Sequence, residues 1–255
     1  MRYIKLVLLS AMVLGLTQTS KAQHIAGSKH DFSDATNASW NVGANLPTSS
    51  TTTQYYIGGQ ICAPCHAPHT YTYTVTGSGA SQTTTSVLGG APTGTPSDAP
   101  LWSHTNSTAT YQPYTGYQMN ATVGQPNGTS KLCLSCHDGT VALSYYRTLP
   151  SKGFTSTTTM ATINNGASNV GTDLRNDHPV SFTYDPALAT ADGKLYDPTQ
   201  ALTGTATNGT IDAELLENLQ VQCTSCHDPH NNSGAPHMLV KSNTGSALCL
   251  TCHNK

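Results

Sequence analysis

Hydrophobic and polar residues follow a regular period over only a few short stretches of this chain. Residues 70–76 alternate Tyr and Thr with one Val, the period of two that is typical of a strand. Residues 54–57 are a second short strand candidate, and the Tyr-rich stretch 111–117 predicts a strand or a loop. Residues 211–221 carry the one convincing helix pattern, with Asp212 as N-cap and leucines on one face. The pattern therefore predicts few regular elements.

The remaining stretches predict mostly loops. Residues 77–100 and 145–177 are rich in Gly, Thr, Ser, Pro or Asn and show no period. Residues 131–139 predict one helical turn that Gly139 closes. The expected fold class is a mostly irregular chain with few short helices and minimal strand.

The first residues have the features of a secretory signal peptide. Arg2 and Lys5 flank the start of an apolar run over residues 4–16, and Ala22 ends a small-x-small cleavage site. A membrane anchor is the alternative, but the run is shorter than the roughly 20 residues that span a bilayer. We expect residues 1–22 to be removed and residues 23–255 to be exported without a membrane span.

The composition is unusual for a protein with an ordinary apolar core. Charged residues make up 9% of the chain and Phe occurs three times, whereas charged residues are about 25% of a typical globular domain. Such a chain is either disordered or packed on something other than its own side chains. The net charge of −2 excludes a basic surface for nucleic acid and permits contact between copies.

Four copies of Cys-x-x-Cys-His contain every cysteine of the chain, and we number them motif 1 to motif 4 in chain order. The cysteines are Cys62, Cys65, Cys133, Cys136, Cys223, Cys226, Cys249 and Cys252, and the histidines are His66, His137, His227 and His253. This spacing is typical of c-type haem attachment. The two thiols form thioethers with the haem, and the histidine becomes the proximal ligand of the iron. The sequence therefore predicts four covalent haems.

Zinc and disulfides are the alternative uses of these cysteines. Structural zinc takes paired Cys-x-x-Cys units around one ion and does not require a histidine after each unit. A disulfide framework suits an exported protein but does not explain four identical spacings. Haem explains both the spacing and the histidine.

The motifs alternate between two types. Motifs 1 and 3 continue as Cys-His-x-Pro-His, whereas motifs 2 and 4 read Leu-Cys-Leu-Ser/Thr-Cys-His. This order indicates a duplicated two-haem module, one copy over residues 62–137 and the other over residues 223–253. We expect one tetrahaem domain over residues 23–255, because neighbouring haems must nearly touch.

The second axial ligand decides what a haem iron does: a second histidine favours electron transfer, and an open position favours substrate binding. Seven histidines lie outside the motifs, and methionine is scarce. The distal candidates are His30, His69, His104, His178 and His230. Five candidates for four irons leave at least one spare, and His24 and His237 are more typical of surface or core histidines.

Two of these candidates stand three residues after a proximal histidine. His69 and His230 cannot reach the far face of their own haem, so each should bind a different iron. The repeat favours the motif 2 or motif 4 haem of the same module, and a haem in a neighbouring subunit is the alternative.

At these segments the chain resembles the doubled-CXXCH multihaem c-type cytochromes, and within them the tetrahaem subunits of extracellular cytochrome filaments, the OmcE-like type. The segments are residues 29–33, 62–69, 100–104, 132–142, 176–182, 223–230 and 248–255. The resemblance implies bis-histidine haems in a stacked chain wrapped by coil. It also implies subunits that polymerise, with one distal histidine supplied by an adjacent subunit.

The expected function is electron transfer by hopping along four bis-histidine haems, not enzymatic catalysis. The expected partners are copies of the chain in an extracellular filament, together with other redox proteins or extracellular electron acceptors. A monomeric periplasmic shuttle is the main alternative. A multihaem reductase with one five-coordinate haem is a weaker one.

Overall fold

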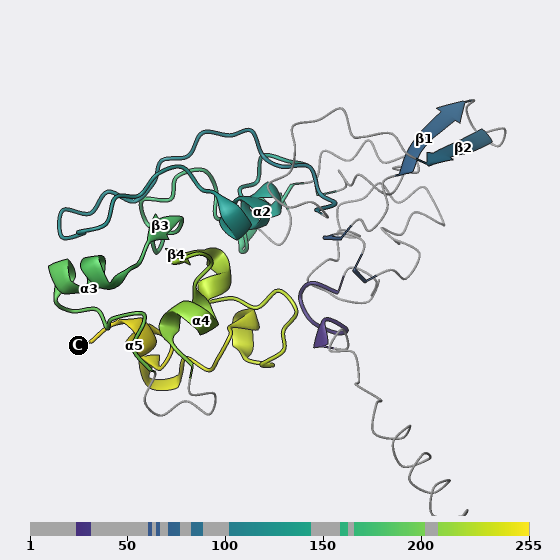
Figure 1. Cartoon of the computed structure of the whole chain (residues 1–255). Coiled ribbons are helices and arrows are strands. Elements are labelled where there is room, and N and C mark those ends of the chain that lie inside the picture. The colour runs from purple at the N-terminus through teal and green to yellow at the C-terminus, as the bar shows by residue number, and fades with distance from the viewer. Residues whose placement is uncertain are drawn as a thin grey trace, which may run out of the picture.

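The computed structural model describes residues 24–31, 61–62, 65–66, 71–76, 83–88, 102–143, 159–162, 166–201 and 209–254. Most of this chain is coil, interrupted by short helices and two two-stranded sheets (Figure 1). The expectation of a largely irregular fold is confirmed. The expected strand at 54–57 and residues 1–22 lie outside the described residues.

A hairpin forms the longer of the two sheets. Strand β1 (Tyr71–Thr76) pairs antiparallel with β2 (Thr83–Leu88), with Tyr71 opposite Leu88, and Figure 1 draws the pair apart from the other elements. The strand predicted at 70–76 is confirmed. The loop predicted over 77–100 is wrong at β2, because a run of Thr and Val supplies β-branched residues that pair well with a neighbouring strand.

Helix α2 (Gly128–His137) carries the whole of motif 2. It is longer than the single turn predicted over residues 131–139. It ends at Asp138, whose N–H is bonded to the Leu134 carbonyl, and Gly139 then takes a left-handed φ of 75°. A glycine just after a helix is the expected stop signal, since only glycine adopts this conformation without strain.

Helix α4 (Ile211–Leu215) is shorter than the helix predicted over residues 211–221. Its N-cap is Thr210, whose hydroxyl accepts from the Ala213 N–H at 3.1 Å, so the prediction of Asp212 as cap is wrong. The chain leaves the helix at Leu216, whose backbone is extended, and residues 218 and 219 are then left-handed. It then enters β4 (Gln220–Val221), which pairs with β3 (Phe182–Thr183).

Helix α3 (Pro186–Asp192) was not predicted. Asp185 caps it by accepting from the Leu188 N–H at 2.8 Å, and Gly193 ends it with a left-handed φ of 70°. An Asp-Pro start and a Gly stop are recognised helix signals. The helix buries only Ala189 fully, so it lacks the apolar stripe on which a sequence prediction depends.

The remaining short elements lie at the C-terminal end, around motifs 3 and 4. They are the 3₁₀ turns η6 (Cys223–Ser225), η7 (Pro236–Met238) and η8 (Thr244–Ser246) and the helix α5 (Cys249–Cys252). No helix in the described part of the chain has the length and apolar character to cross a membrane.

The described chain has two small apolar clusters rather than one large core. The larger joins Phe182, Tyr184, Ala189, Ile211 and Val221. The smaller joins Leu134 of α2 to Tyr111 and Leu174. Clusters of this size agree with a composition poor in large apolar residues.

Candidate haem-binding site

The four motifs share one local turn. In motif 1 the His66 N–H donates to the Cys62 carbonyl at 2.8 Å, and the corresponding bonds of His227 and His253 measure 3.0 Å. Motif 2 makes the same turn inside α2. Residues three and four apart share one face of a helical turn. Each motif therefore presents two thiols and an imidazole together, as one group with two thioethers and an axial ligand requires.

All eight cysteines are free thiols in the structure, so no disulfide connects the motifs. Burial raises the pKa of several of these thiols, to about 11 for Cys65 and for Cys252. No three or more His, Cys, Asp or Glu side chains converge on a single metal point in the described chain. Cys65 and Cys252 are therefore neutral thiols at neutral pH, whereas a hydrogen bond with Cys133 lowers the pKa of Cys223 to about 7.

Thiols of successive motifs lie close enough to influence one another. Burial, and after it the Cys65 thiol, raises the pKa of Cys136 to about 12. A hydrogen bond with Cys223, followed by burial, raises the pKa of Cys133. Burial and then the Cys249 thiol raise the pKa of Cys226. The thiols thus form one row in which motifs 1, 2, 3 and 4 follow one another in chain order.

Three motif histidines each face a second histidine. His137 lies opposite His30 at 6.2 Å between ring centroids, His66 opposite His230 at 6.1 Å, and His253 opposite His178 at 6.4 Å. The angles between the ring planes are 49°, 4° and 76° respectively.

These separations match two imidazoles on opposite sides of one metal ion. With a metal–nitrogen bond of about 2 Å and a ring nitrogen about 1.1 Å from its ring centroid, the centroids lie about 6.2 Å apart. The parallel rings of His66 and His230 are too far apart for their faces to touch. Because this distance recurs at three different angles, a shared central ion explains it better than ring stacking does.

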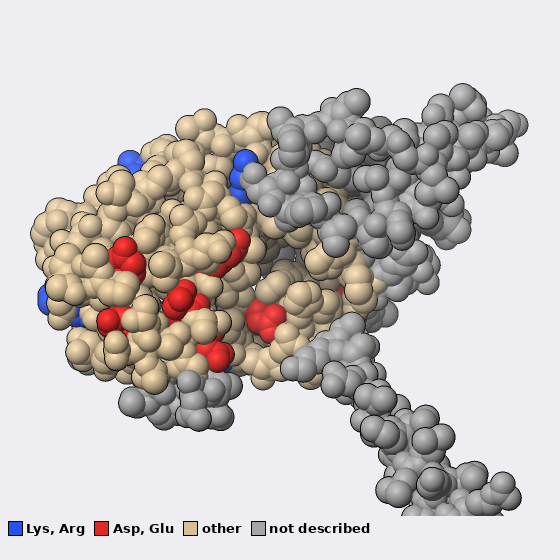
Figure 2. Space-filling model, viewed as in Figure 1, with Lys and Arg blue, Asp and Glu red and all other residues tan. Residues whose placement is uncertain are grey.

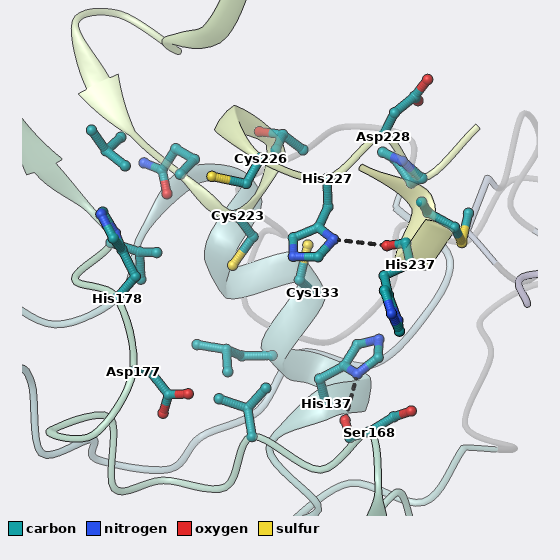
Figure 3. A pocket seen from close by; sticks show the side chains of 18 of the residues that line it. Cys133, His137, Ser168, Asp177, His178, Cys223, Cys226, His227, Asp228 and His237 are labelled. Carbon is teal, nitrogen blue, oxygen red and sulfur yellow. Dashed lines mark hydrogen bonds between the residues drawn. The ribbon is translucent and has the colours of Figure 1, made fainter. Parts of the chain in front are cut away.

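Hydrogen bonds to backbone carbonyls orient three of the imidazoles. The Nδ1 atoms of His137 and His227 lie 2.8 and 3.1 Å from the carbonyl oxygens of Ser168 and His237 (Figure 3). The Nδ1 atom of His178 lies 2.9 Å from the Pro179 carbonyl oxygen. A carbonyl only accepts, so Nδ1 carries the proton and donates. This tautomer leaves the lone pair on Nε2 for a metal ion.

His30 is held in a similar way. The backbone of Pro229 is hydrogen-bonded to its ring, and burial followed by the nearby His137 ring lowers the pKa of His30 to about 4. The neutral imidazole that metal binding requires is therefore the form present at neutral pH.

His104 is placed differently from the other candidates. Its side chain is fully buried, with Nδ1 at 3.0 Å from the Thr105 carbonyl and Nε2 at 3.2 Å from the Ala142 carbonyl. Ser135 adds a contact to Nδ1 at 3.2 Å. Both ring nitrogens are occupied by protein groups, so His104 stabilises the chain around α2 in this structure.

The partner expected for His230 is not the one the structure shows. The motif repeat favoured the motif 4 haem, but the His230 ring faces His66 of motif 1, and His253 of motif 4 faces His178. The Asp228 carboxylate shapes the turn that carries His230, because it accepts from the N–H groups of His230 and Asn232 at 2.9 and 2.7 Å.

The remaining candidates contribute less. His69 lies outside the described residues. His24 is exposed, and its carbonyl accepts from Asn231. His237 is also exposed, and its contribution is the carbonyl that orients His227.

A cavity of about 510 Å³ joins motifs 2 and 3. Cys133, Cys223 and Cys226 line it together with His30 and His178, and the sulfur atoms of Cys133 and Cys223 face the same space (Figure 3). Apolar side chains complete the wall: Leu134, Val170, Leu174, Val180, Val221 and Met238. The volume lies within the roughly 300–1,000 Å³ of cofactor pockets. Thiols, imidazoles and an apolar wall together fit a covalent haem.

Sequence reasoning missed the groups that orient the proximal histidines. Ser168 and His237 act through backbone carbonyls. Every residue has a carbonyl, so no residue type could have marked these positions in the sequence.

Comparison with protein families supports the motif assignment. Residues 217–255 match the family described as Doubled CXXCH motif, and the match covers motifs 3 and 4. No curated protein matches the chain. The doubled motif indicates covalently bound c-type haem and supports a place among the multihaem c-type cytochromes.

Proposed function

We propose that this chain is an exported tetrahaem cytochrome that carries electrons, and that it serves as the repeating subunit of an extracellular filament. The observation that carries the electron-transfer role is the set of three histidine pairs at 6.1–6.4 Å. Each pair joins a motif histidine to a histidine from another part of the chain. An iron held on both sides has no open position for a substrate, so its role is electron transfer.

We assign three of the five distal candidates from the histidine pairs. His30 serves motif 2, His230 serves motif 1 and His178 serves motif 4. Among the described residues no imidazole faces His227 of motif 3. His69 is the remaining candidate for this iron, in the same subunit or a neighbouring one, and His104 is the spare.

The row of thiols supports an electron path through the haems in the order 1, 2, 3, 4. Haem supplies the one-electron iron chemistry when bound. The chain attaches it and orients two of the proximal imidazoles through carbonyl hydrogen bonds. His230 stands three residues after the motif 3 histidine and faces His66 of motif 1, so it connects these two haem-binding motifs.

The surface supports assembly into a filament. Most of the described surface in Figure 2 is uncharged, with acidic side chains over the middle of this face and Lys and Arg at its margins. A surface with few charges permits close contact between copies, since little charge must be desolvated. The signal-peptide pattern in residues 1–22 supports export.

The test is to purify the haem-loaded protein and measure three properties. Mass spectrometry should give four haems per chain, and the optical spectrum should contain only low-spin haem. Negative-stain electron microscopy should show filaments. Fewer than four haems contradicts the motif assignment. A high-spin component that binds carbon monoxide favours the reductase, and discrete particles at every concentration favour the monomeric shuttle.

A further inference from the structure

Gln222 lies at a junction between motifs 2 and 3. It directly precedes Cys223, its side chain is only 2% exposed, and it belongs to neither motif. A buried amide is tolerated only when its hydrogen bonds are satisfied, so its partners show what it holds together.

The amide of Gln222 is bonded at both ends. Its Nε2 donates to Asn127 Oδ1 at 2.9 Å and to Gln220 Oε1 at 3.1 Å. Its Oε1 accepts from Ser181 Oγ at 3.1 Å and, more weakly, from the Ser130 N–H at 3.4 Å. Asn127 and Ser130 lie at the start of α2, so one side chain joins this helix to the turn of motif 3.

Neighbouring bonds reinforce the junction. The Ser130 hydroxyl accepts from the Cys223 N–H at 3.0 Å, and the hydroxyls of Thr129 and Thr224 lie 2.8 Å apart. Gly128 leaves room for the amide, since a Cβ there would lie 2.9 Å from Gln222 Nε2. The first turn of α2 is therefore fixed directly against η6.

The consequence is that the first cysteines of two motifs face one cavity. Cys133 lies one turn along α2 from Ser130, and both Cys133 and Cys223 line this cavity. Figure 3 shows both sulfur atoms directed into the shared cavity. Each of these atoms is the attachment point of a different haem.

We propose that Gln222 is a positioning residue that sets the distance between the haems of motifs 2 and 3. This inference rests on the proposed function, because it requires haems at both motifs. The electronic coupling of two haems falls steeply as their edges separate. A side chain that fixes the first turn of α2 against the turn of motif 3 therefore controls this step of the electron path.

The test compares haem-loaded variants with the parent protein. Gln222→Met keeps a similar volume and removes the hydrogen bonds of the amide. Ser130→Ala removes only the hydroxyl that holds the Cys223 N–H and is the milder change. Gln118→Ala is the matched control, because Gln118 is exposed and bonds only its neighbour Tyr117 in the described chain.

Haem content is measured by mass spectrometry. Coupling between haems is measured by circular dichroism in the Soret band, where coupled haems give a two-signed signal, and by spin–spin broadening in the electron paramagnetic resonance (EPR) spectrum. We expect Ser130→Ala to retain four haems and to lose part of the two-signed signal and of the broadening. Gln222→Met should lose more, and Gln118→Ala should lose none. If Ser130→Ala and every haem-loaded Gln222→Met preparation keep the parent signal, the inference is overturned. A parent protein without haem would instead overturn the proposed function.

Discussion

The angle between two axial imidazoles determines the electronic state of the iron between them. Parallel planes separate two iron d orbitals in energy, whereas perpendicular planes leave them nearly equal. The pair His66–His230 is almost parallel at 4°, and the pair His178–His253 is close to perpendicular at 76°. With iron bound between each of these pairs, the two irons would differ in electronic structure.

This difference predicts two kinds of EPR signal from the oxidised protein. The motif 1 iron should give a rhombic spectrum with three resolved lines, and the motif 4 iron a single strongly anisotropic line at low field. The variant His178→Ala identifies the second signal, because that signal alone should disappear. One rhombic spectrum shared by all four irons would contradict the ring angles.

The placements of His104 and His178 predict opposite effects of losing each imidazole. His178→Ala should open a coordination position and give a high-spin haem that binds carbon monoxide. His104→Ala should leave the haem spectrum low-spin and lower the free energy of unfolding by about 1–3 kcal/mol, because buried hydrogen bonds are lost. Optical spectra and thermal unfolding measure the two effects. The assignment fails if His104→Ala gives the high-spin signal.

At this scale the sequence predicts the attachment residues and proximal histidines, since covalent chemistry imposes a fixed local spacing on them. It did not predict which distal histidine faces which motif. The ring that faces His66, for example, comes from a turn 164 residues later, so no local pattern could identify it.

Short elements in this chain depend on their caps, because they bury little apolar surface. Thr210 caps α4, while Asp212 lies in its first turn without a capping bond. Thr210→Ala should therefore lower the free energy of unfolding by about 0.5–2 kcal/mol. Asp212→Ala should cost less, about 0.3–1 kcal/mol from the lost interaction with the helix dipole. Denaturant unfolding of both variants checks the order, and a larger loss for Asp212→Ala contradicts the cap.

Helix α2 is anchored at its other end by Tyr111. The Tyr111 hydroxyl donates to Asp138 Oδ2 at 2.7 Å, and both residues are buried. Burial, and after it the bond to Asp138, raises the pKa of Tyr111, so the phenol remains a donor through the neutral range. Tyr111 thereby fastens the segment before α2 to the C-terminal end of the helix that bears His137.

Removing this hydroxyl should destabilise the protein measurably. Tyr111→Phe leaves the buried Asp138 carboxylate short of a donor and should lower the free energy of unfolding by about 1–3 kcal/mol. Tyr117→Phe is the control: Tyr117 is 95% exposed, and its change should stay within about 0.5 kcal/mol. Equal losses in the two variants would show that the bond to Asp138 contributes nothing.

Elements were predictable where a local pattern repeats and unpredictable where pairing depends on a distant segment. The Tyr-Thr alternation of β1 was sufficient to identify a strand. Strand β4 interrupts the predicted helix because Val221 pairs with Phe182. The local sequence of residues 218–221 does not predict this pairing. The chain there follows tertiary pairing rather than its own helical period.

The described chain has two small apolar clusters, and thiols of successive motifs are neighbours in it. We expect haem to supply much of the order of such a chain, because each haem adds a large apolar surface and several covalent and coordinate bonds. The low fraction of charged residues leaves surfaces on which copies can meet. We therefore expect both the fold and the assembly to depend on haem loading.

This dependence makes His69 the decisive residue at the scale of the assembly. Three motif histidines have partners within the described chain, and His227 requires one from elsewhere. If His69 of one subunit serves the motif 3 iron of the next, then His69→Ala removes a ligand and an intersubunit bond in a single change. The variant should show one high-spin haem in four and should not form filaments in negative-stain images.

His24→Ala, which changes an exposed histidine, should retain both the spectrum and the filaments. Filaments with a fully low-spin spectrum in His69→Ala would show that the bond between subunits is made by another residue. A high-spin signal in intact filaments would place the His69 ligand within its own subunit.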